Sequence, residues 1–175
     1  MVEIDFITAL GRLLRDGKLR DAFAADPQAV AAQIKLRPSD WPDFLQLIPA
    51  DLEFQAQILL RKRLELVRHL LPETTRRAGD QFDPAFFKYA RTCWPPELRA
   101  ALQDAFEFCR ELKRQQSIVV DASEWNRLVF AISRRRTALH WVQMATRNKK
   151  IHRGFQIFLR INGQNWREIF LYLGL

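Results

Sequence analysis

The sequence predicts an α+β fold, with a mostly helical part over residues 1–136 and a small three-stranded antiparallel sheet over residues 137–175. Two observations favour this division. Up to about residue 135, apolar residues recur every three or four positions, which is the period of an amphipathic helix. From Thr137 onward the period changes to two, which is the period of a strand. We expect the sheet to pack on the helices, because so few strands are only marginally stable alone.

The first fifty residues carry start signals for several short helices. Asp5 is placed to cap a first helix, and Gly17 is placed to end it. Asp26-Pro27 joins a capping carboxylate to a proline at the first helical position. Pro38-Ser39-Asp40 precedes another apolar segment in a similar way. These residues predict short helices joined by tight turns.

The longest predicted helix covers residues 50–71 and stops at Pro72. At a rise of 1.5 Å per residue, this helix would be roughly 33 Å long. Its apolar residues at helical spacing form the predicted core face: Leu52, Phe54, Ile58, Leu59, Leu66, Val67 and Leu70.

Three further helices are predicted before the sheet. Asp83-Pro84 opens a short helix, and Pro95-Pro96 opens a second long helix that places Cys109 in the core. Asp121 and Glu124 have the spacing of a capping box, in which each side chain bonds a backbone N–H of the other residue. They predict a last helix that ends before three consecutive arginines.

The predicted strands are residues 138–144, 155–161 and 166–173, and Asn162-Gly163 between the last two is a strong hairpin signal. The register of this hairpin depends on the length of its loop, which the sequence leaves open. A two-residue turn would place on the face of Ile157 the residues Trp166, Phe170 and Tyr172. A three-residue loop would place there Ile169, Leu171 and Leu173.

The basic residues are concentrated at the C-terminal end of the chain. The 28 Lys and Arg residues exceed the 20 Asp and Glu residues, which gives a net charge of +8 and a pI of about 10.1. Residues 134–175 hold nine basic residues and one acidic residue, whereas residues 1–117 are nearly balanced. This asymmetry indicates an anionic partner.

Composition and patterning exclude several classes of protein. Hydrophobic residues make up 48% of the chain, which is typical of a packed domain rather than a disordered one. No run reaches the roughly 18 apolar residues that a membrane helix needs. The first residues lack the basic and apolar regions of a secretory signal, so we expect a cytoplasmic protein.

The sequence gives little support for catalysis by this chain. The three histidines, His69, His140 and His152, are far apart and show no metal-ligand spacing. The glycines form no phosphate-binding loop. Cys93 and Cys109 lack the close partner of a redox pair, so we expect free thiols. We assign no catalytic residue, no metal ligand and no cofactor to this chain.

Peptide binding is the function that the pattern favours. The edge strands of a three-stranded meander can accept an extended peptide as another strand, and the edges here are residues 138–144 and 166–172. Cations before and after the first strand would favour an acidic peptide. The predicted peptide-binding residues are Arg134, Arg135, Arg136, Leu139, Trp141, Gln143, Arg147, Lys149, Lys150, Glu168, Phe170 and Tyr172. The sequence does not say which edge is free, and the simpler interpretation is that the cations only solubilise an aromatic-rich sheet.

The alternative function is that of a nucleic-acid-binding regulator, because basic side chains beside aromatic rings also suit this partner. Against it, no predicted helix carries a basic face with base-reading polar residues, and the aromatic spacing of an RNA-recognition motif is absent. Salt separates the two functions, since phosphate contacts weaken steeply as salt rises and strand addition does not.

The order of the segments resembles the methanobactin biosynthesis protein C family. The resemblance lies in the residues 52–63 running into 67–72, in residues 82–94, and in the short antiparallel sheet at the end. More broadly, the N-terminal part is similar to helical domains found beside or fused to TIM-barrel multi-iron oxidases.

The resemblance implies a non-catalytic subunit that forms a heterodimer with a TIM-barrel multinuclear iron oxidase. In that family, the pair converts cysteines of a ribosomally made precursor peptide into oxazolone and thioamide groups of a copper-binding natural product. The iron belongs to the partner subunit, and this chain would help to bind the leader segment of the precursor. For the contact with the oxidase, we select Trp41 and Trp94 among the helices.

Overall fold

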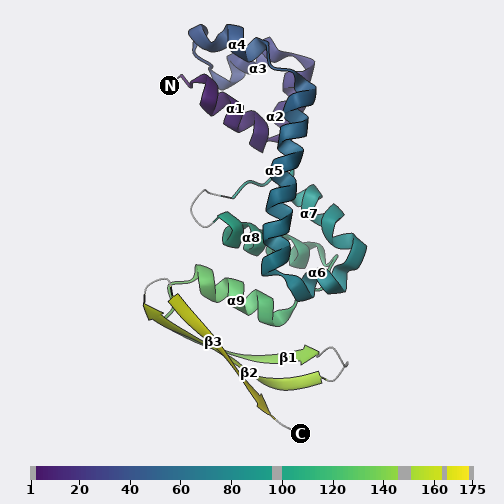
Figure 1. Cartoon of the computed structure of the whole chain (residues 1–175), viewed down its shortest axis with the longest axis vertical. Helices are drawn as coiled ribbons and strands as arrows, with labels where there is room; N and C mark the ends of the chain where they lie inside the picture. The colour runs from purple at the N-terminus through teal and green to yellow at the C-terminus, as the bar shows by residue number, and fades with distance from the viewer. Residues whose placement is uncertain (1–2, 96–99, 146–150, 163–164, 174–175) are drawn as a thin grey trace. The chain divides into compact units, whose positions relative to one another are not determined.

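The computed structural model describes residues 3–95, 100–145, 151–162 and 165–173, and it confirms the α+β architecture (Figure 1). Helices occupy the chain up to Ile132, and a three-stranded antiparallel sheet follows. The chain forms two compact units. The first comprises Met1–Leu66 and Asp83–Pro95, and the second comprises Val67–Phe82 and Pro96–Leu175. No helix in the described ranges is both long enough and apolar enough to cross a membrane.

The helices that lie wholly or partly in the first unit are short apart from one. They are α1 (Phe6–Arg15), α2 (Gly17–Ala25), α3 (Pro27–Ile34), the 3-10 helix η1 (Pro38–Asp40), α4 (Trp41–Leu45), α5 (Pro49–Leu70) and α7 (Phe82–Ala90). The N-terminal core is formed by α1 to α4 and the start of α5. Its buried residues are Ala9, Leu13, Phe23, Val30, Ala31, Ile34, Leu36, Phe44 and Leu52. The rings of Phe23 and Phe44 meet edge to face, with centroids 5.1 Å apart.

Two of the three residues predicted to begin or end a short helix, Asp5, Asp26 and Gly17, do so in the structure. Asp5 caps α1 and Asp26 caps α3, each by accepting a backbone N–H in the first turn. The prediction that Gly17 ends α1 is wrong, because Asp16 lies between the two helices and Gly17 is the first residue of α2. Gly17 instead lies against Arg91, where an added Cβ would come within 2.8 Å of the Arg91 side chain. Close approach of two segments therefore explains this glycine.

The predicted core face of α5 is wrong in part. Phe54 and Leu66 are 64% and 55% exposed. The buried apolar residues of this helix are Leu52, Ala56, Leu60, Leu64 and Val67. The predicted residues and the buried residues both have helical spacing, so periodicity alone could not decide which of two neighbouring faces of the helix is buried. Ala56 is on the buried face, but its side chain is too weakly hydrophobic to indicate that face in the sequence.

The second unit contains the end of α5 and the elements that follow it. They are α6 (Pro72–Ala78), the 3-10 helix η2 (Gly79–Gln81), α8 (Ala100–Gln115), α9 (Ala122–Ile132), β1 (Thr137–Ala145), β2 (Ile151–Asn162) and β3 (Asn165–Leu173). Pro72 follows the end of α5, as predicted, and is also the first residue of α6. The predicted start of α8 at Pro95-Pro96 falls partly outside the described residues: Pro95 is not helical, Pro96 is not described, and the described part of α8 begins at Ala100. Cys109 on α8 is buried, which confirms it as a core residue.

Glu124 does not complete a capping box with Asp121, and it bonds another helix instead. Asp121 caps α9 as predicted. The Glu124 carboxylate, however, accepts the backbone N–H of Glu73 at 2.6 Å, the N–H of Thr74 at 3.0 Å and the Thr74 hydroxyl at 2.6 Å. The Thr74 hydroxyl oxygen in turn accepts the backbone N–H of Asp121 at 3.0 Å. The Glu124 side chain of α9 thus accepts hydrogen bonds from backbone N–H groups in the first turn of α6, which have no acceptor within their own helix.

The hydrogen bonds between Glu124 and Thr74 are buried, so losing one of them would cost folding free energy. Glu124 is 2% exposed and Thr74 is fully buried. Burial raises the pKa of Glu124 above its usual value, although the three donors oppose this shift. Ionisation of Glu124 therefore lowers the free energy of unfolding. The stability that the protonated side chain contributes is fully present below pH 4.5, and it is lost as the pH rises through the higher pKa of Glu124 in the folded state.

The sheet is a meander in the order β1-β2-β3, as predicted. Ile157 lies opposite Leu139 on one side and Ile169 on the other, so the face of Ile157 carries the set expected for a three-residue loop. Asn162 nevertheless pairs with Asn165, and the register shifts between Arg160 and Asn162. An irregularity within the strand supplies the extra residue that a three-residue loop would have supplied, and this is compatible with a two-residue turn. Gly163 itself lies outside the described residues.

Replacing Thr74 with Val should destabilise the second unit. The Thr74→Val variant keeps the shape of the side chain but leaves the buried Asp121 N–H and Glu124 carboxylate each short of one partner. We expect a loss of about 2 kcal/mol in the free energy of unfolding, measured by urea denaturation.

Thr75 offers a matched control on the same helix. Its hydroxyl is buried and makes no hydrogen bond within the part of the chain that the structure describes. Thr75→Val carries the same helix-propensity cost as Thr74→Val and removes no hydrogen bond, so it should be neutral or slightly stabilising. Equal losses in the two variants would contradict the role given to Thr74.

Candidate functional site

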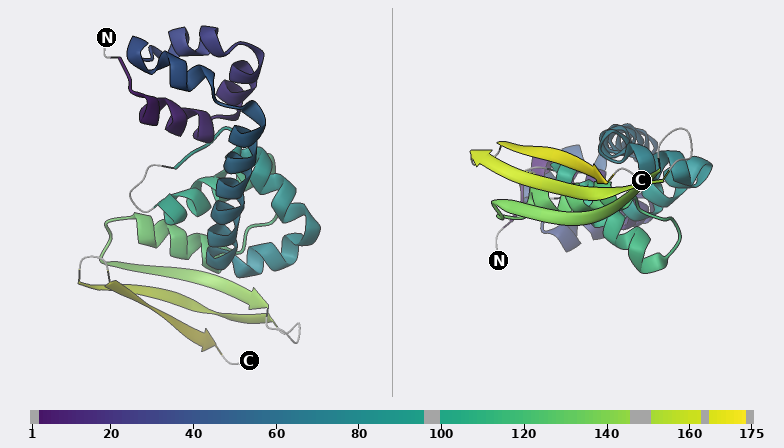
Figure 2. Two further views of the ribbon diagram at one scale, coloured as in Figure 1. Left: turned by 45° about the horizontal axis from the view of Figure 1, so that its top comes forward. Right: turned by 90° about the horizontal axis from the view of Figure 1, so that it is seen from below.

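One face of the sheet packs against α9 (Figure 2). Phe158 of β2 is fully buried and stacks on Phe130 of α9, with ring centroids 4.9 Å apart. Trp166 of β3 lies edge-on to both rings, at 5.7 Å from Phe130 and 5.5 Å from Phe158. This aromatic cluster connects two of the strands to one helix and determines which face of the sheet is buried.

Polar side chains connect the same face to α9. Gln156 is fully buried, and its amide nitrogen donates to the Ser123 carbonyl at 3.0 Å and to Glu168 at 2.7 Å. Asn126 donates to the amide oxygen of Gln156 at 3.1 Å. Arg127 of α9 holds Glu168 through two hydrogen bonds of 2.8 and 3.2 Å. Every polar atom of Gln156 is thereby satisfied, as burial requires.

The opposite face of the sheet is apolar and exposed. Six side chains on it are between 38% and 62% exposed: Leu139, Trp141, Leu159, Ile169, Leu171 and Leu173. We call this the outer face. Phe155 and Ile157 lie between them and are partly buried. A contiguous apolar surface of this kind is typical of a binding surface.

Three of the predicted peptide-binding residues form the free edge of β1. Arg160 of β2 donates its backbone N–H to the Arg136 carbonyl at 2.8 Å, directly across the ladder. Because hydrogen-bonded pairs alternate along antiparallel strands, the backbone groups of every second residue of β1 point away from β2. These residues are Leu139, Trp141 and Gln143. Their side chains lie on the outer face, so edge and outer face meet along one strand.

The free edge of β3 differs from that of β1. By the same alternation, its outward backbone groups belong to Glu168, Phe170 and Tyr172. The side chains of these residues lie on the α9 side of the sheet, where Glu168 is held by Arg127 and by Gln156. Neither β1 nor β3 pairs with a further strand among the described residues. The sheet therefore offers two open edges with different chemistry.

Three exposed arginines lie between α9 and β1. Arg134, Arg135 and Arg136, which we call the arginine corner, have exposed side chains, and none of them has an ion-pair partner in the described ranges. Their positive charges lie beside the start of the free β1 edge. Three other predicted binding residues, Arg147, Lys149 and Lys150, lie outside the described residues.

The backbone of the arginine corner is held in place by Arg160, a residue that the sequence analysis did not select. Its guanidinium donates to the carbonyls of Arg135 at 3.0 Å, Phe130 at 3.0 Å and Ser133 at 2.9 Å. The guanidinium also lies 5.1 Å from the centre of the Phe130 ring. The basic character of Arg160 was visible in the sequence, but its pairing with the end of α9 depends on strand register.

The two tryptophans selected for a partner interface are half-buried and have contacts within the first unit. Trp41 donates its indole N–H to the Leu36 carbonyl at 3.1 Å. The ring of Trp94 lies near two guanidinium groups, 4.5 Å from that of Arg63 and 5.6 Å from that of Arg15. A role of these tryptophans in binding another subunit stays a prediction.

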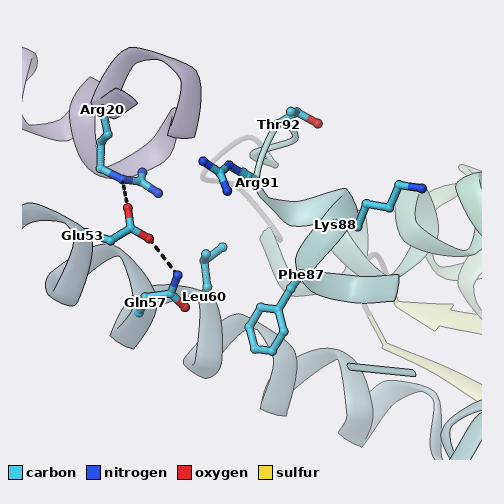
Figure 3. Close-up of a pocket in the computed structure, with 8 residues that line it drawn as sticks. All are labelled: Arg20, Glu53, Gln57, Leu60, Phe87, Lys88, Arg91 and Thr92. Carbon is cyan, nitrogen blue, oxygen red and sulfur yellow. Dashed lines mark hydrogen bonds and ion pairs between the residues drawn. The ribbon is translucent and has the colours of Figure 1, made fainter. Parts of the chain in front are cut away.

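The first unit contains a pocket that the sequence analysis missed (Figure 3). Its volume is about 370 Å³, and it is lined by Arg20, Glu53, Gln57, Leu60, Phe87, Lys88, Arg91 and Thr92. Hydrogen bonds from Gln57 and from Arg20 lower the pKa of Glu53 below its usual value. Arg20 is 7% exposed and also donates to the carbonyls of Leu13 and Leu14. Its charge is therefore engaged in the fold.

Two observations concern metal binding and thiol chemistry in the described residues. No three His, Cys, Asp or Glu side chains among them lie close enough together to hold a metal ion. Burial raises the pKa of the Cys109 thiol to about 12, so this group stays protonated at neutral pH and cannot act as a nucleophile. The arrangement that these residues do provide is an exposed strand edge beside an apolar face and a basic corner.

Comparison with known proteins gives one likeness. Residues 47–114 are similar to the family described as SCO6045-like, C-terminal domain. This stretch, less than half of the chain, begins just before α5 and ends in the last turn of α8, so it does not include the sheet. Neither the curated proteins nor the solved structures gave a match.

Replacing Arg160 should loosen the arginine corner. Arg160→Met keeps much of the apolar stem but removes the donors to three carbonyls. We expect a loss of about 1–3 kcal/mol in the free energy of unfolding and faster amide exchange at residues 133–137. Lys113 lies over Trp125 and makes no such carbonyl bonds among the described contacts, so Lys113→Met is a control. Unchanged exchange in Arg160→Met would contradict the role given to Arg160.

Proposed function

We propose that this chain is the non-catalytic partner subunit of an iron-dependent peptide-modifying oxidase. Its sheet would bind the leader segment of a ribosomally made precursor peptide as an added strand. The observation that carries this proposal is the free edge of β1, where backbone groups of Leu139, Trp141 and Gln143 point away from the sheet. Strand addition uses such groups for affinity and neighbouring side chains for selectivity.

The identity of the chemistry rests on the resemblance to the methanobactin biosynthesis protein C family. By that resemblance, the oxidase would hold the iron and would convert precursor cysteines into oxazolone and thioamide groups. The product would be a copper-binding natural product. This chain would contribute binding surface and no reacting group.

The charge of the sheet region supports an acidic peptide as the ligand. The arginine corner has three exposed guanidinium groups beside the start of the β1 edge. Exposed cations attract acidic partners over about one Debye length, roughly 8 Å at physiological salt. They also raise the rate of association more than the final affinity.

Co-expression tests the proposed assembly. When the full chain is co-expressed with the proposed TIM-barrel oxidase and a small precursor peptide, the two proteins should co-purify as a 1:1 complex that contains iron, as measured by size exclusion and metal analysis. The mass of the precursor should change only when both proteins are present. A chain that does not co-purify and instead carries nucleic acid would favour the alternative, a regulator that binds nucleic acid.

Charge reversal tests the role of the arginine corner. The triple variant Arg134→Glu, Arg135→Glu and Arg136→Glu should weaken precursor binding about tenfold or more at low salt, because each exposed ion pair contributes roughly 0.2–1 kcal/mol and reversal adds repulsion. The control reverses three exposed cations of the first unit, Lys18, Arg61 and Lys62. Fluorescence anisotropy of a labelled precursor measures both. Equal losses would assign the effect to net charge rather than to the corner.

A further inference from the structure

The pocket of the first unit is lined by one buried and two exposed cations beside an apolar wall. We propose that this pocket binds a small organic anion, in which a carboxylate or phosphate group is joined to a compact apolar body. The inference goes beyond the proposed function and does not rest on it, because every residue that lines the pocket belongs to the first unit and the sheet belongs to the second.

Arg20 of α2 supplies a donor that the fold holds in place but does not use. The residue is 7% exposed, its Nε donates to Glu53 at 2.9 Å, and its Nη1 donates to the carbonyls of Leu13 and Leu14 at 3.0 and 3.2 Å. Its other terminal nitrogen, Nη2, has no acceptor in the part of the chain that the structure describes. An anion that accepts from Nη2 would form a charge-assisted hydrogen bond with a side chain whose position is already fixed.

Arg91 supplies a second set of donors. Figure 3 shows the guanidinium groups of Arg20 and Arg91 on facing sides of the pocket. Arg91 lies against Gly17, whose N–H donates to the Arg91 carbonyl at 3.4 Å and whose missing Cβ leaves room for the Arg91 side chain. The Nη2 of Arg91 donates to both oxygens of Asp21, at 3.1 and 2.9 Å, whereas its Nε and Nη1 have no acceptor among the described residues. Two guanidinium groups that face one space are suited to bind an oxyanion.

The pocket offers more hydrogen-bond donors than acceptors. Among the described residues that line it, Glu53 has the one acidic side chain, and its oxygens already accept from Arg20 at 2.9 Å and from Gln57 at 2.8 Å. Lys88 is exposed and has no ion-pair partner in the described ranges, and it points away from the two arginines in Figure 3, so its charge attracts an anion only over a longer distance. The unused N–H groups need acceptors, and an anion therefore fits this lining better than a cation or an apolar molecule.

Leu60 and Phe87 form the apolar wall of the pocket. Leu60 is buried and Phe87 is half-buried, and Figure 3 shows both side chains below the guanidinium group of Arg91 in that view. The volume of about 370 Å³ is near the lower end of the roughly 300–1,000 Å³ that small-molecule pockets occupy. The lining thus predicts a ligand with an anionic group at one end and a small apolar or aromatic body at the other.

Four probe molecules test the class of ligand, each titrated into the full chain and followed by amide NMR shifts. Benzoate and phenyl phosphate carry the two candidate anionic groups, benzamide has the shape of benzoate without its charge, and inorganic phosphate lacks the apolar body. We expect benzoate or phenyl phosphate to shift the amides of residues 17–20 and 88–92 with a dissociation constant of roughly 1 mM, which suits ligands of this size. The tighter of these two probes would identify the anionic group.

The other two probes set the outcomes that would overturn the proposal. Benzamide should bind about tenfold more weakly than benzoate, because it cannot form charge-assisted hydrogen bonds with the two arginines. Equal affinity of benzamide and benzoate would overturn the anion, and inorganic phosphate that binds as tightly as phenyl phosphate would overturn the apolar body. If none of the probes shifts the amides of residues 17–20 and 88–92 at concentrations of about 20 mM, the pocket is not a binding site for this class of ligand.

Two variants change the binding of the tighter probe in opposite directions. Arg91→Gln removes the second guanidinium and should weaken binding about tenfold. Asp21→Asn removes the carboxylate that competes for Arg91 and should tighten binding about threefold. The controls with the same charge changes are Lys62→Gln and Asp43→Asn, which are exposed in the first unit and do not line the pocket, and each should change the affinity less than about twofold. Equal effects in variants and controls would assign the change to net charge and overturn the site.

The gain expected in Asp21→Asn keeps the test decisive if Arg91→Gln does not fold, because unfolding cannot increase the affinity for the probe. Asp21 is exposed and its pair with Arg91 lies at the surface, so this variant should fold. Gly17→Ala adds a third measurement without any change of charge, since its Cβ would come within 2.8 Å of the Arg91 side chain and displace it. We expect weaker binding in Gly17→Ala, and an unchanged affinity in both Gly17→Ala and Asp21→Asn would overturn the role given to Arg91.

Discussion

The packing of α9 on the sheet is the constraint on which the rest of the candidate site depends. Gln156 is fully buried in this contact, and its three hydrogen bonds are satisfied only in one strand register. A shift by one residue would move every side chain to the other face and leave buried polar groups without partners. The exposed position of Trp141 therefore follows from the buried position of Gln156.

Sequence periodicity and capping residues predicted most of the fold, because the features that carry them are local. Asp5, Asp26 and Asp121 begin helices as expected, and the meander has the expected order. The prediction of the Glu124 partner was wrong because a contact between residues far apart in the sequence determines it. Glu124 bonds Thr74, fifty residues earlier in the chain, and no local pattern indicates that partner.

Part of the candidate site was likewise predictable from local sequence features, and part of it depends on contacts between distant residues. Edge residues such as Leu139, Trp141 and Gln143 could be selected because alternation along a strand is visible in the sequence. The direction of their backbone groups required the register, and the role of Arg160 required the position of the end of α9. The hairpin illustrates why: an irregularity inside β2 has the same effect on the faces as a longer loop, and residue types alone do not separate the two.

The two compact units are interleaved along the chain, and this has a consequence for folding and for dissection of the protein. The chain leaves the first unit after Leu66, returns at Asp83 and leaves it again after Pro95. No single proteolytic cut can therefore release either unit as one continuous piece. The contact between Thr74 and Glu124 closes a long loop that contains the returning segment, so this part of the second unit must wait during synthesis until both ends have left the ribosome.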